Sequence, residues 1–590
     1  MNRRVVPPSR PNCHPVIDTL PPHTIAGHGA RVRLDGSAAR ALETGRTRLL
    51  AAGLVFALAF TVIGGRLVDL TLLSQNSEPK IAGGPTAPQR ETGRADIIDR
   101  NGVLLATTLP TASLWANPHQ VLDPYDAAVQ LNTALPELSQ AEILAKLTSD
   151  KGFVWLKRGL TPRQQYAINR LGVPGLQFRQ EPRRYYPHAS LTAHSVGFTD
   201  VDDNGLAGIE RSFDSDLRGA VQPLALSIDL RIQHVLTQAL ADTMTEFKAI
   251  GAAGIVMDVR TGEIVAMTSL PDFDPNHPGS ALADARFNRA SLGVYEMGSV
   301  FKIFTTAMAL DGGIVTLDDR YDTSKPIRIG RFTISDFKPK NGPLSVPEIL
   351  MYSSNIGTAR IAMDVGALMQ REFLDRLGLM LPSTVELSEV GHPMLPSPWR
   401  EINMLTISYG HGMAVSPIRL VSAVSAIVNG GILRPATLLR QPANTEIPGT
   451  RVISEQTSHQ MRQLMRLVVT RGTGKKANAD GYMVGGKTGT ADKLIGGKYA
   501  RDARVASFVG AFPMTEPRYA VFVMVDEPKG NASTYNYATG GWVAAPAVRR
   551  VVEQIGPLLG VEPIRTDPED EESELLYVRA SAKAEKVAAN

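Results

Sequence analysis

An apolar run at residues 301–310 (FKIFTTAMAL) contains a lysine but no proline or glycine. The run predicts a buried helix whose first turn follows Gly298. Because positions i and i+3 lie on one face of a helix, Lys302 would stand beside the hydroxyl of Ser299, on the inner side of an apolar element. Burial lowers the pKa of a lysine, since the ammonium form loses its hydration. A neutral amine in this place can take the proton of the serine and make the serine a nucleophile.

The Ser-x-x-Lys spacing by itself is a weak signal. Residues 77–80 (SEPK) and 335–338 (SDFK) have the same spacing, and about one chance match is expected in a chain of this length. The first match lies in a stretch rich in proline and glycine, and the second is followed by Pro339. Neither is predicted to open an apolar helix, so the helix context favours Ser299 as the reactive serine.

Two further patterns follow in the chain. Residues 352–355 (YSSN) lie between predicted helical stretches and contain Ser-x-Asn, a pattern that residues 74–76 (SQN) also match. Residues 485–490 (GGKTGT) lie where a strand is predicted to lead into a sheet, and Lys-Thr-Gly, with a chance expectation of about a tenth, occurs once. Together these patterns add six residues to the candidate site: Ser353, Asn355, Lys487, Thr488, Gly489 and Thr490.

An uncharged run from residue 49 to residue 65 (LLAAGLVFALAFTVIGG) predicts a membrane-spanning helix, and the continuation to Leu73 makes it long enough when tilted. Eight arginines and three acidic residues precede the run, whereas residues 74–93 hold two acidic and two basic residues. The positive-inside rule therefore places the N-terminus in the cytoplasm and the chain from about residue 74 outside. The alternative is a cleaved signal peptide, whose n-region of about 48 residues would be far longer than usual.

Charge and cysteine content narrow the choice of partners and cofactors. A formal net charge of +4 over 590 residues is too small to predict a nucleic-acid partner. The single cysteine, Cys13, rules out a disulfide within the chain. No His and Cys cluster suggests a metal site, so we expect neither a metal nor another cofactor.

The order of predicted elements indicates two folded units outside the membrane. The first contains a hairpin around the Asn-Gly turn at residues 101–102, and its basic and aromatic residues 183–186 (RRYY) are predicted to lie on a solvated strand. The second contains, in order, a helix at 230–249, strands at 254–259 and 263–268, a mainly helical stretch in 345–430, strands at 505–512 and 519–525, and a helix at 542–559.

This order predicts an α+β fold, in which an antiparallel sheet is flanked by helices and joined to a helical subdomain. A single transmembrane helix and an elongated mixed α/β pedestal precede it. The predicted segments are a disordered cytoplasmic tail (1–48), the anchor (49–73), the pedestal (74–223), the main domain (224–560) and a disordered acidic tail (561–590).

With these motifs in place, the chain resembles the class B penicillin-binding proteins, and among them those specific for cell division. The likeness extends from the anchor to about residue 560, and it includes residues 94–106, 208–214, 408–417 and 539–546. Met297 departs from the family pattern, which generally has proline there. This difference affects the rigidity of the backbone before Ser299 more than it affects the chemistry. The resemblance implies a serine D,D-transpeptidase that cross-links peptidoglycan stem peptides at the septum and is a target of β-lactams.

The resemblance also implies roles for the residues of the first two motifs. Ser299 is the nucleophile, and Lys302 is the base that deprotonates it. Ser353 relays a proton to the nitrogen of the departing D-alanine. Asn355 orients Lys302 and binds the substrate amide.

The third motif is expected to anchor the substrate. By this likeness Lys487 supplies positive charge near the terminal carboxylate of the substrate, which the hydroxyls of Thr488 and Thr490 also bind. Gly489 lets the strand backbone approach the substrate closely. The backbone N–H groups of Ser299 and Thr490 would form the oxyanion hole.

We expect the chain to be a single-pass protein of the inner membrane at the division site, with a cytoplasmic N-terminus and a periplasmic catalytic domain. The partners that the resemblance implies are peptidoglycan stem peptides, β-lactam antibiotics, a polytopic glycan polymerase of the FtsW type and other division proteins. A membrane helix with few polar groups is consistent with contacts inside the bilayer.

Three alternatives stay open at this point. The motifs do not specify the acceptor, so a D,D-carboxypeptidase or a β-lactamase-like hydrolase would use the same residues. An elongation-specific class B transpeptidase has a similar pedestal, although residues 541–546 (GWVAAP) favour division. A non-enzymatic penicillin sensor would be expected to carry further membrane segments and a cytoplasmic signalling domain, and neither is predicted.

Overall fold

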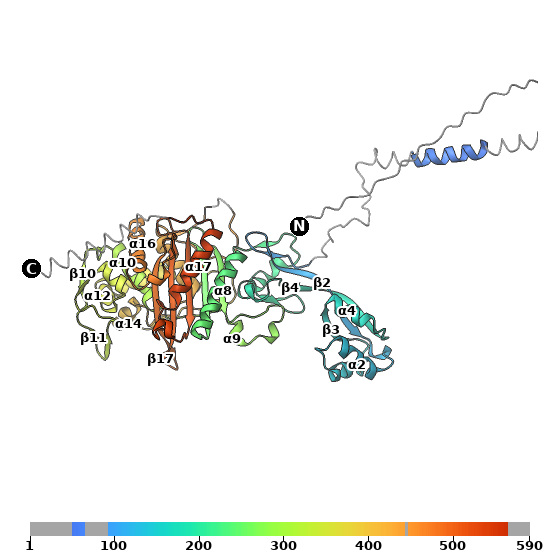
Figure 1. Cartoon of the computed structure of the whole chain (residues 1–590), viewed down its shortest axis with the longest axis horizontal. Coiled ribbons are helices and arrows are strands. Elements are labelled where there is room, and N and C mark those ends of the chain that lie inside the picture. Colours follow the sequence, from blue (N-terminus) through green and yellow to red (C-terminus); the bar gives the residue numbers. More distant parts are fainter. Residues whose placement is uncertain (1–49, 65–92, 443–445, 565–590) are drawn as a thin grey trace, which may run out of the picture. The chain divides into compact units, whose positions relative to one another are not determined.

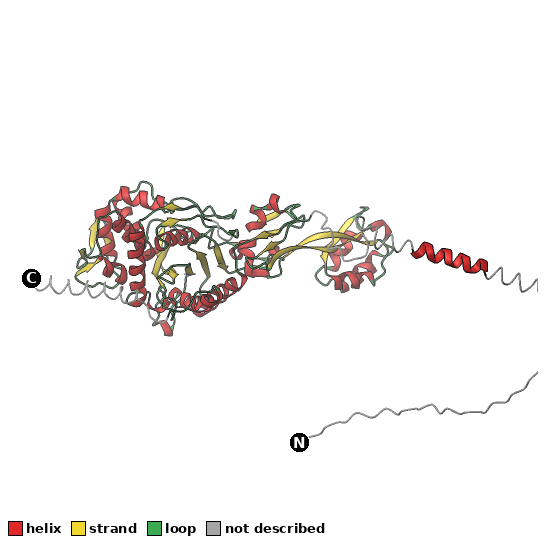
Figure 2. Cartoon of the chain, turned by 90° about the horizontal axis from the view of Figure 1, so that it is seen from above, coloured by secondary structure: helices red, strands yellow, loops and turns green. Residues whose placement is uncertain are grey.

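The computed structural model describes residues 50–64, 93–442 and 446–564. The chain divides into two units, residues 1–89 and residues 90–590. Figure 1 shows the order of the elements along the chain, and Figure 2 shows the same chain coloured by secondary structure.

The predicted membrane anchor is described only in part. Residues 50–64 form a helix. Within the described ranges, no helix is both long and apolar enough to span a membrane. Residue 49 and residues 65–73 of the predicted anchor lie outside the described residues, as do residues 1–48 and 565–590 of the predicted tails.

A five-stranded antiparallel sheet forms the centre of the second unit, in the order β16-β17-β18-β8-β9. Its strands come from distant parts of the sequence: β8 (Gly251–Asp258), β9 (Ile264–Leu270), β16 (Gly485–Ile495), β17 (Lys498–Phe512) and β18 (Tyr519–Asp526). Every residue of β8 and β18 is buried, because helices cover both faces of the sheet. The four apolar runs predicted as strands are confirmed, and the strand with the Lys-Thr-Gly motif is the edge strand β16.

Helices pack on both faces of the sheet, seen in Figure 2 as red ribbons around yellow strands. On one face, α8 (Leu230–Phe247) and α17 (Ala544–Leu558) pack together and share a core with the strands. On the other face, α15 (Pro417–Val428) packs against β8 and β18, and α16 (Glu455–Thr470) packs against β16. Both helices predicted at the ends of the main domain, over residues 230–249 and 542–559, are therefore confirmed.

The long connection between β9 and β16 is mainly helical, as predicted. Its helices are α9 (Ala283–Arg286), α10 (Lys302–Asp311), α11 (Val346–Tyr352), α12 (Asn355–Val365), α13 (Ala367–Arg376) and α14 (Glu401–Ser408), followed by α15 and α16. Three short antiparallel strand pairs accompany them: β10 (Arg320–Asp322) with β13 (Pro343–Ser345), β11 (Ile327–Ile329) with β12 (Phe332–Ile334), and β14 (Ile432–Leu433) with β15 (Thr450–Arg451).

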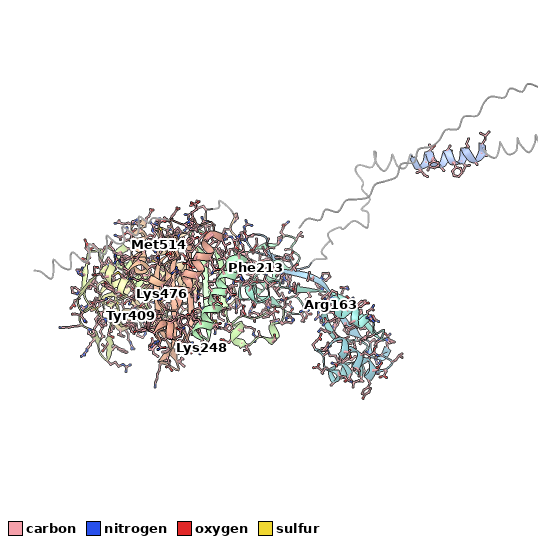
Figure 3. All side chains as sticks on the ribbon, in the orientation of Figure 1. Arg163, Phe213, Lys248, Tyr409, Lys476 and Met514 are labelled. Carbon is pink, nitrogen blue, oxygen red and sulfur yellow. The ribbon has the colours of Figure 1, made fainter. Side chains whose placement is uncertain are left out.

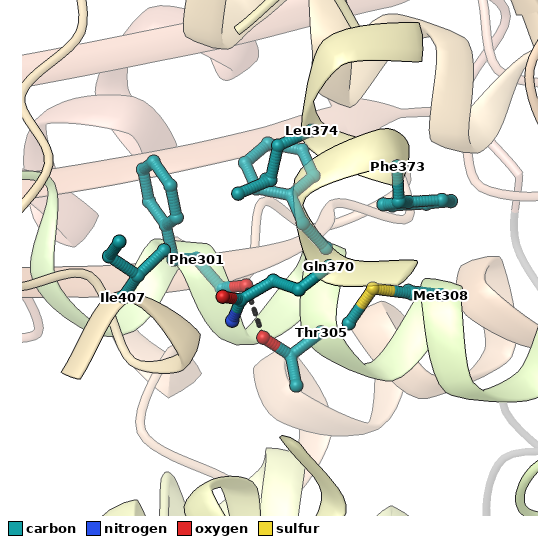
Figure 4. A pocket seen from close by; sticks show the side chains of 8 residues that line it. Phe301, Thr305, Met308, Gln370, Phe373, Leu374 and Ile407 are labelled. Carbon is teal, nitrogen blue, oxygen red and sulfur yellow. Dashed lines mark hydrogen bonds between the residues drawn. The ribbon is translucent and has the colours of Figure 1, made fainter. Parts of the chain in front are cut away.

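A small hollow lies between α10, α13 and α14 in this helical subdomain (Figure 4). Its walls are mainly aromatic and aliphatic, and its two polar side chains are Thr305 and Gln370. Both are already engaged, because the Thr305 hydroxyl donates to the Ser408 carbonyl at 2.8 Å and the Gln370 amide donates to the Met404 carbonyl at 2.9 Å. No titratable group lines the hollow, so it is an imperfectly packed part of the core and not a reaction site.

The pedestal is built around a second sheet. Its strands have the order β3-β2-β1-β7, and β4 pairs with β2. The strands and helices are β1 (Ile97–Ile98), β2 (Leu104–Ala116), α2 (Pro124–Ala134), α3 (Gln140–Leu147), β3 (Val154–Leu160), α4 (Pro162–Asn169), β4 (Leu176–Tyr185), α5 (Ala193–Val196), β5 (Phe198–Thr199), β6 (Gly205–Ala207), α6 (Gly208–Ser212), α7 (Asp214–Leu217) and β7 (Leu224–Ala225). The hairpin predicted around the Asn-Gly turn is confirmed as the β1–β2 pair.

A buried ion cluster joins the start of the pedestal to its end. The carboxylate of Glu210 is fully buried, and it accepts hydrogen bonds from the guanidinium groups of Arg94 and Arg184. Arg94 also donates to Asp214 at 2.7 Å. The prediction of a solvated strand at residues 183–186 is therefore wrong for two of them. Arg184 is 5% exposed because its guanidinium pairs with the buried Glu210, and Tyr186 is 3% exposed because its ring packs in the core.

The turn between β1 and β2 contacts the second domain directly. One carboxylate oxygen of Asp99 accepts the backbone N–H groups of Asn101 and Val103, and the other accepts the N–H of Leu230 at the start of α8 at 3.2 Å. Arg100 pairs with Glu263 at 3.6 Å. The same turn therefore closes the pedestal hairpin and caps the first helix of the main domain.

Replacing Glu210 with alanine leaves the two buried guanidinium groups without their shared carboxylate. We expect the free energy of unfolding to fall by about 3–5 kcal/mol, the usual cost of breaking a buried ion pair. Urea unfolding of the full chain in detergent measures this change. The matched control is Glu553→Ala, which removes the exposed partner of Arg549 and should change stability by about 1 kcal/mol or less. Equal effects of the two substitutions would contradict a stabilising role for the buried cluster.

Candidate active site

A short 3-10 turn, η5 (Gly298–Phe301), carries Ser299 into the start of α10. Gly298 has φ of +51°, and a Cβ atom at this position would lie 2.5 Å from the carbonyl oxygen of Thr490. Only glycine permits both this backbone conformation and this close approach of the turn to β16. Lys302 follows one turn after Ser299 and is fully buried, so the predicted helix and the predicted burial of its lysine are confirmed.

The amine of Lys302 is held by the Ser-x-Asn turn. Its Nζ donates to the carbonyl oxygen of Ser353 at 2.5 Å, to the hydroxyl of Ser353 at 3.0 Å and to Oδ1 of Asn355 at 2.8 Å. Burial lowers the pKa of Lys302 well below its ordinary value, and the charge of Lys487 lowers this pKa further. Ser299 lies in η5, three residues before Lys302, and its hydroxyl forms none of the hydrogen bonds found among the described residues.

Ser353 stands between two buried lysines. It ends α11 in the left-handed conformation, with φ of +62°, and its Oγ accepts from Lys302 and, at 2.9 Å, from Nζ of Lys487. Burial lowers the pKa of Lys487 to about 7. Two amines with lowered pKa values therefore share one hydroxyl, an arrangement in which protons can pass between three groups.

A carboxylate that the sequence did not single out fixes this turn. Oδ2 of Asp336 accepts from the Ser354 hydroxyl at 2.7 Å, and its Oδ1 accepts from the backbone N–H groups of Asn355 at 2.6 Å and Ile356 at 3.0 Å. Its negative charge raises the pKa of Lys302, against the larger lowering effects. The Ser-x-x-Lys match at residues 335–338 was not predicted to open an apolar helix. In the structure it follows the short strand β12 and does not begin a helix. Their aspartate nevertheless belongs to the site.

The edge strand β16 presents two faces to the site. Lys487 and Gly489 face η5, since the Lys487 amine reaches Ser353 and a Cβ at Gly489 would lie 2.5 Å from the Met297 carbonyl oxygen. Thr488 and Thr490 face the other way. The Thr488 hydroxyl lies 2.9 Å from that of Thr473, and the Thr490 hydroxyl accepts from the N–H of Gly540 at 3.1 Å. The structure thus brings all eight predicted site residues to this edge of the sheet.

A second polar contact beside the site was also not predicted. Glu296 accepts from the N–H of Gly412 at 2.9 Å and from the hydroxyl of Tyr499 at 2.9 Å. It thereby ties the approach to Ser299 to the β16–β17 hairpin and to the loop after α14. His411 in this loop has its pKa lowered by burial. No local spacing connects these residues, so only the folded chain identifies them.

Among the described residues, no group of three or more His, Cys, Asp and Glu side chains could hold a metal ion. The side chains gathered at the site offer the chemistry of a serine hydroxyl, two buried amines and a hydroxyl between them. This set can form and cleave an ester by general acid and base catalysis.

Family models match two stretches of the chain. Residues 252–553 match the penicillin binding protein transpeptidase domain, and residues 89–222 match the penicillin-binding protein dimerisation domain. The chain therefore belongs to the penicillin-binding proteins with a transpeptidase domain, as the fold and the Ser299 cluster indicate. Its two-domain organisation places it in class B of that family.

Within this family the chain is similar to proteins named peptidoglycan D,D-transpeptidase. The chain is 42% identical over 493 residues to "Probable peptidoglycan D,D-transpeptidase FtsI" of Caulobacter vibrioides, covering 81% of this chain and 84% of that one. It is 31% identical over 559 residues to "Peptidoglycan D,D-transpeptidase FtsI" of Escherichia coli K12, covering 88% and 92%. The crystal structure of penicillin binding protein 3 from Mycobacterium tuberculosis, complexed with aztreonam, has the same fold, with a TM-score of 0.64 at 24% identity over 80% of this chain and 97% of that one.

Stability should depend on pH through Lys487. Its pKa is about 7 in the folded chain and 10.5 in an unfolded one, so the unfolded chain binds one more proton between these values. Stability therefore rises with pH in this window, by up to about 1.4 kcal/mol per pH unit from this group. We expect the Lys487→Met variant to lose this part of the slope in urea unfolding between pH 7.5 and 9.5.

The exposed Lys498 supplies the control for this measurement. Lys498→Met should retain the slope of the wild type. A Lys487→Met variant with an unchanged slope would show that Lys487 is protonated in the folded chain throughout this range.

Proposed function

We propose that this chain is a D,D-transpeptidase that cross-links the stem peptides of peptidoglycan through an acyl-enzyme on Ser299. The observation that carries the proposal is the pair of buried lysines around Ser353, next to Ser299 and at the edge of a sheet. The transpeptidase domain of the family and the relatives named peptidoglycan D,D-transpeptidase support the same reaction.

Acylation begins with the hydroxyl of Ser299. Lys302, as a neutral amine, takes its proton while Oγ attacks the carbonyl carbon between the two D-alanines. The C–N bond then breaks, and the proton reaches the nitrogen of the departing D-alanine through the hydroxyl of Ser353. The lowered pKa of Lys302 supports its role as base, and the hydrogen bonds of Ser353 to both lysines support its role as relay. Asn355 holds Lys302 in place.

The donor peptide lies along β16 in this proposal. Among the strands that the structure describes, β16 pairs with β17 alone, so an extended peptide can add along its outer edge. Thr488 and Thr490 bind the terminal carboxylate, with Lys487 supplying positive charge, and Gly489 leaves room for the peptide. The N–H groups of Ser299 and Thr490 form the oxyanion hole, a role supported by the close approach of η5 to β16 at Gly298.

The amine of a second stem peptide then takes the acyl group from Ser299. Water in its place would make the chain a D,D-carboxypeptidase or a β-lactamase-like hydrolase, and the same residues would serve. The names of the relatives favour transfer to an amine and a role in division over one in elongation.

We place the enzyme at the division site of the inner membrane. A single helix over residues 49–73 anchors it, with the N-terminus in the cytoplasm and the catalytic domain in the periplasm. The pedestal (74–223) and the transpeptidase domain (224–560) follow, and the family matches at residues 89–222 and 252–553 support this division. The partners are a polytopic glycan polymerase of the FtsW type and other division proteins.

Covalent labelling by a fluorescent penicillin tests the nucleophile. We expect Ser299→Ala to slow labelling of the detergent-solubilised chain by at least about a thousandfold, because no hydroxyl is left to form the ester. Ser335→Ala, which changes the other described Ser-x-x-Lys serine, should label like the wild type. Labelling that survives Ser299→Ala and is lost in Ser335→Ala would show that the nucleophile is wrongly assigned.

Depletion of the protein in its own cells tests the biological role. We expect long filaments in which constriction fails, and a fluorescent fusion of the full chain should restore division and lie in the membrane at the septum. Microscopy of cell shape and of the fusion measures both. Rounded cells with normal septa would instead assign the enzyme to elongation.

A further inference from the structure

Two lysines and two aromatic rings form a continuous set of contacts in the transpeptidase domain. Nζ of Lys338 lies 5.9 Å from the ring centre of Tyr537, the rings of Tyr537 and Trp542 are stacked at 6.2 Å, and Nζ of Lys476 lies 4.4 Å from the ring of Trp542. Figure 3 labels Lys476. We call these four residues the cation–aromatic rim.

Each segment of the rim is attached to a different part of the proposed site. Lys338 follows Asp336, whose carboxylate holds the backbone N–H of Asn355. Trp542 follows Gly540, whose N–H donates to the hydroxyl of Thr490.

The third segment is attached in the same way. Lys476 follows Thr473, whose hydroxyl lies 2.9 Å from that of Thr488. A Cβ atom at Gly541, next to Trp542, would lie 3.7 Å from Cγ2 of Thr488. The segments of Lys476 and Trp542 therefore border the side of β16 to which the two threonines point, and the contact of Lys338 with Tyr537 joins the third segment to them.

The rim carries positive charge that the described residues do not neutralise. Lys157 and Lys493 form ion pairs with carboxylates, whereas no carboxylate of the described residues pairs with Lys338 or Lys476. Both ammonium groups are exposed and rest on ring faces, which hold a cation in place without using up its hydrogen-bond donors. Tyr535, 76% exposed and 5.8 Å from the Trp542 ring, adds apolar surface beside them. Such a surface fits an anionic group on a peptide.

We propose that the rim is an acceptor subsite, which selects acceptor stem peptides with a free carboxylate beside the reacting amine. This inference rests on the proposed function. Aminolysis of the acyl-enzyme is acylation run backwards with a different amine, so the acceptor occupies the place that the leaving D-alanine vacated, at the threonine side of β16. There the amine forms a C–N bond to the acyl carbon, the ester C–O bond breaks, and the amine proton returns to Oγ of Ser299.

The test compares two acceptors on the detergent-solubilised full chain. The acyl-enzyme is formed from an N-acyl-D-alanyl thioester, and D-alanine or D-alaninamide is added as acceptor. Mass spectrometry then gives the ratio of transfer product to hydrolysis product. For Lys338→Met/Lys476→Met we expect this ratio to fall about tenfold with D-alanine, since charge-assisted contacts to the carboxylate are lost. With D-alaninamide the ratio should stay within about twofold of the wild type.

Lys475→Met is the matched control, because Lys475 is the exposed neighbour of Lys476 and has no ring contact among the described residues. It should leave both ratios unchanged. Equal losses with the two acceptors, or no loss with either, would overturn the subsite. A wild-type chain that forms no acyl-enzyme from the thioester would instead refute the proposed function, so the two failures are distinct.

Discussion

The structure of this domain depends on two buried lysine side chains that contact one hydroxyl, because the elements that carry them must be held in place. Lys302 and Lys487 are both fully buried, and both reach the hydroxyl of Ser353. Two positive charges in such a place repel each other and lack hydration, so at least one amine is easily deprotonated. The arrangement persists only if α10, the turn after α11 and strand β16 are each held rigidly. The sheet, the helices on both its faces and the Asp336 carboxylate supply that rigidity.

Close backbone contacts bring the serine turn and the edge strand β16 together. Gly298 lies against the Thr490 carbonyl, Gly489 lies against the Met297 carbonyl, and Gly540 lies against the Gly489 carbonyl. A side chain at Gly298 or Gly489 would separate the serine turn from the edge strand, and one at Gly540 would push the loop before α17 away from β16. Met297, where the family generally has proline, is 1% exposed and packs in the core. Its burial therefore restrains the backbone that leads into Ser299.

Much of the site could be predicted because its residues carry local signals. The apolar run after Ser299 indicated a buried helix with a lysine in it, and the single Lys-Thr-Gly identified β16. Asp336 and Glu296 had no such signal, because their partners are 18 or more residues away and the contacts are to backbone N–H groups or single hydroxyls. Arg184 was misjudged for a similar reason: a basic stretch suggests solvent, and only the fold shows that Glu210 is buried beside it.

The sequence alone therefore determined the elements, their order and the reactive residue types, since helix and strand periodicity and short motifs are local properties. Tertiary structure decided what surrounds those residues. It placed Ser353 between two lysines, turned Thr488 and Thr490 away from Lys302, and assembled the rim of Lys338, Tyr537, Trp542 and Lys476 from three distant segments. The reason is physical, because burial, charge proximity and ring contacts depend on which segments meet in space.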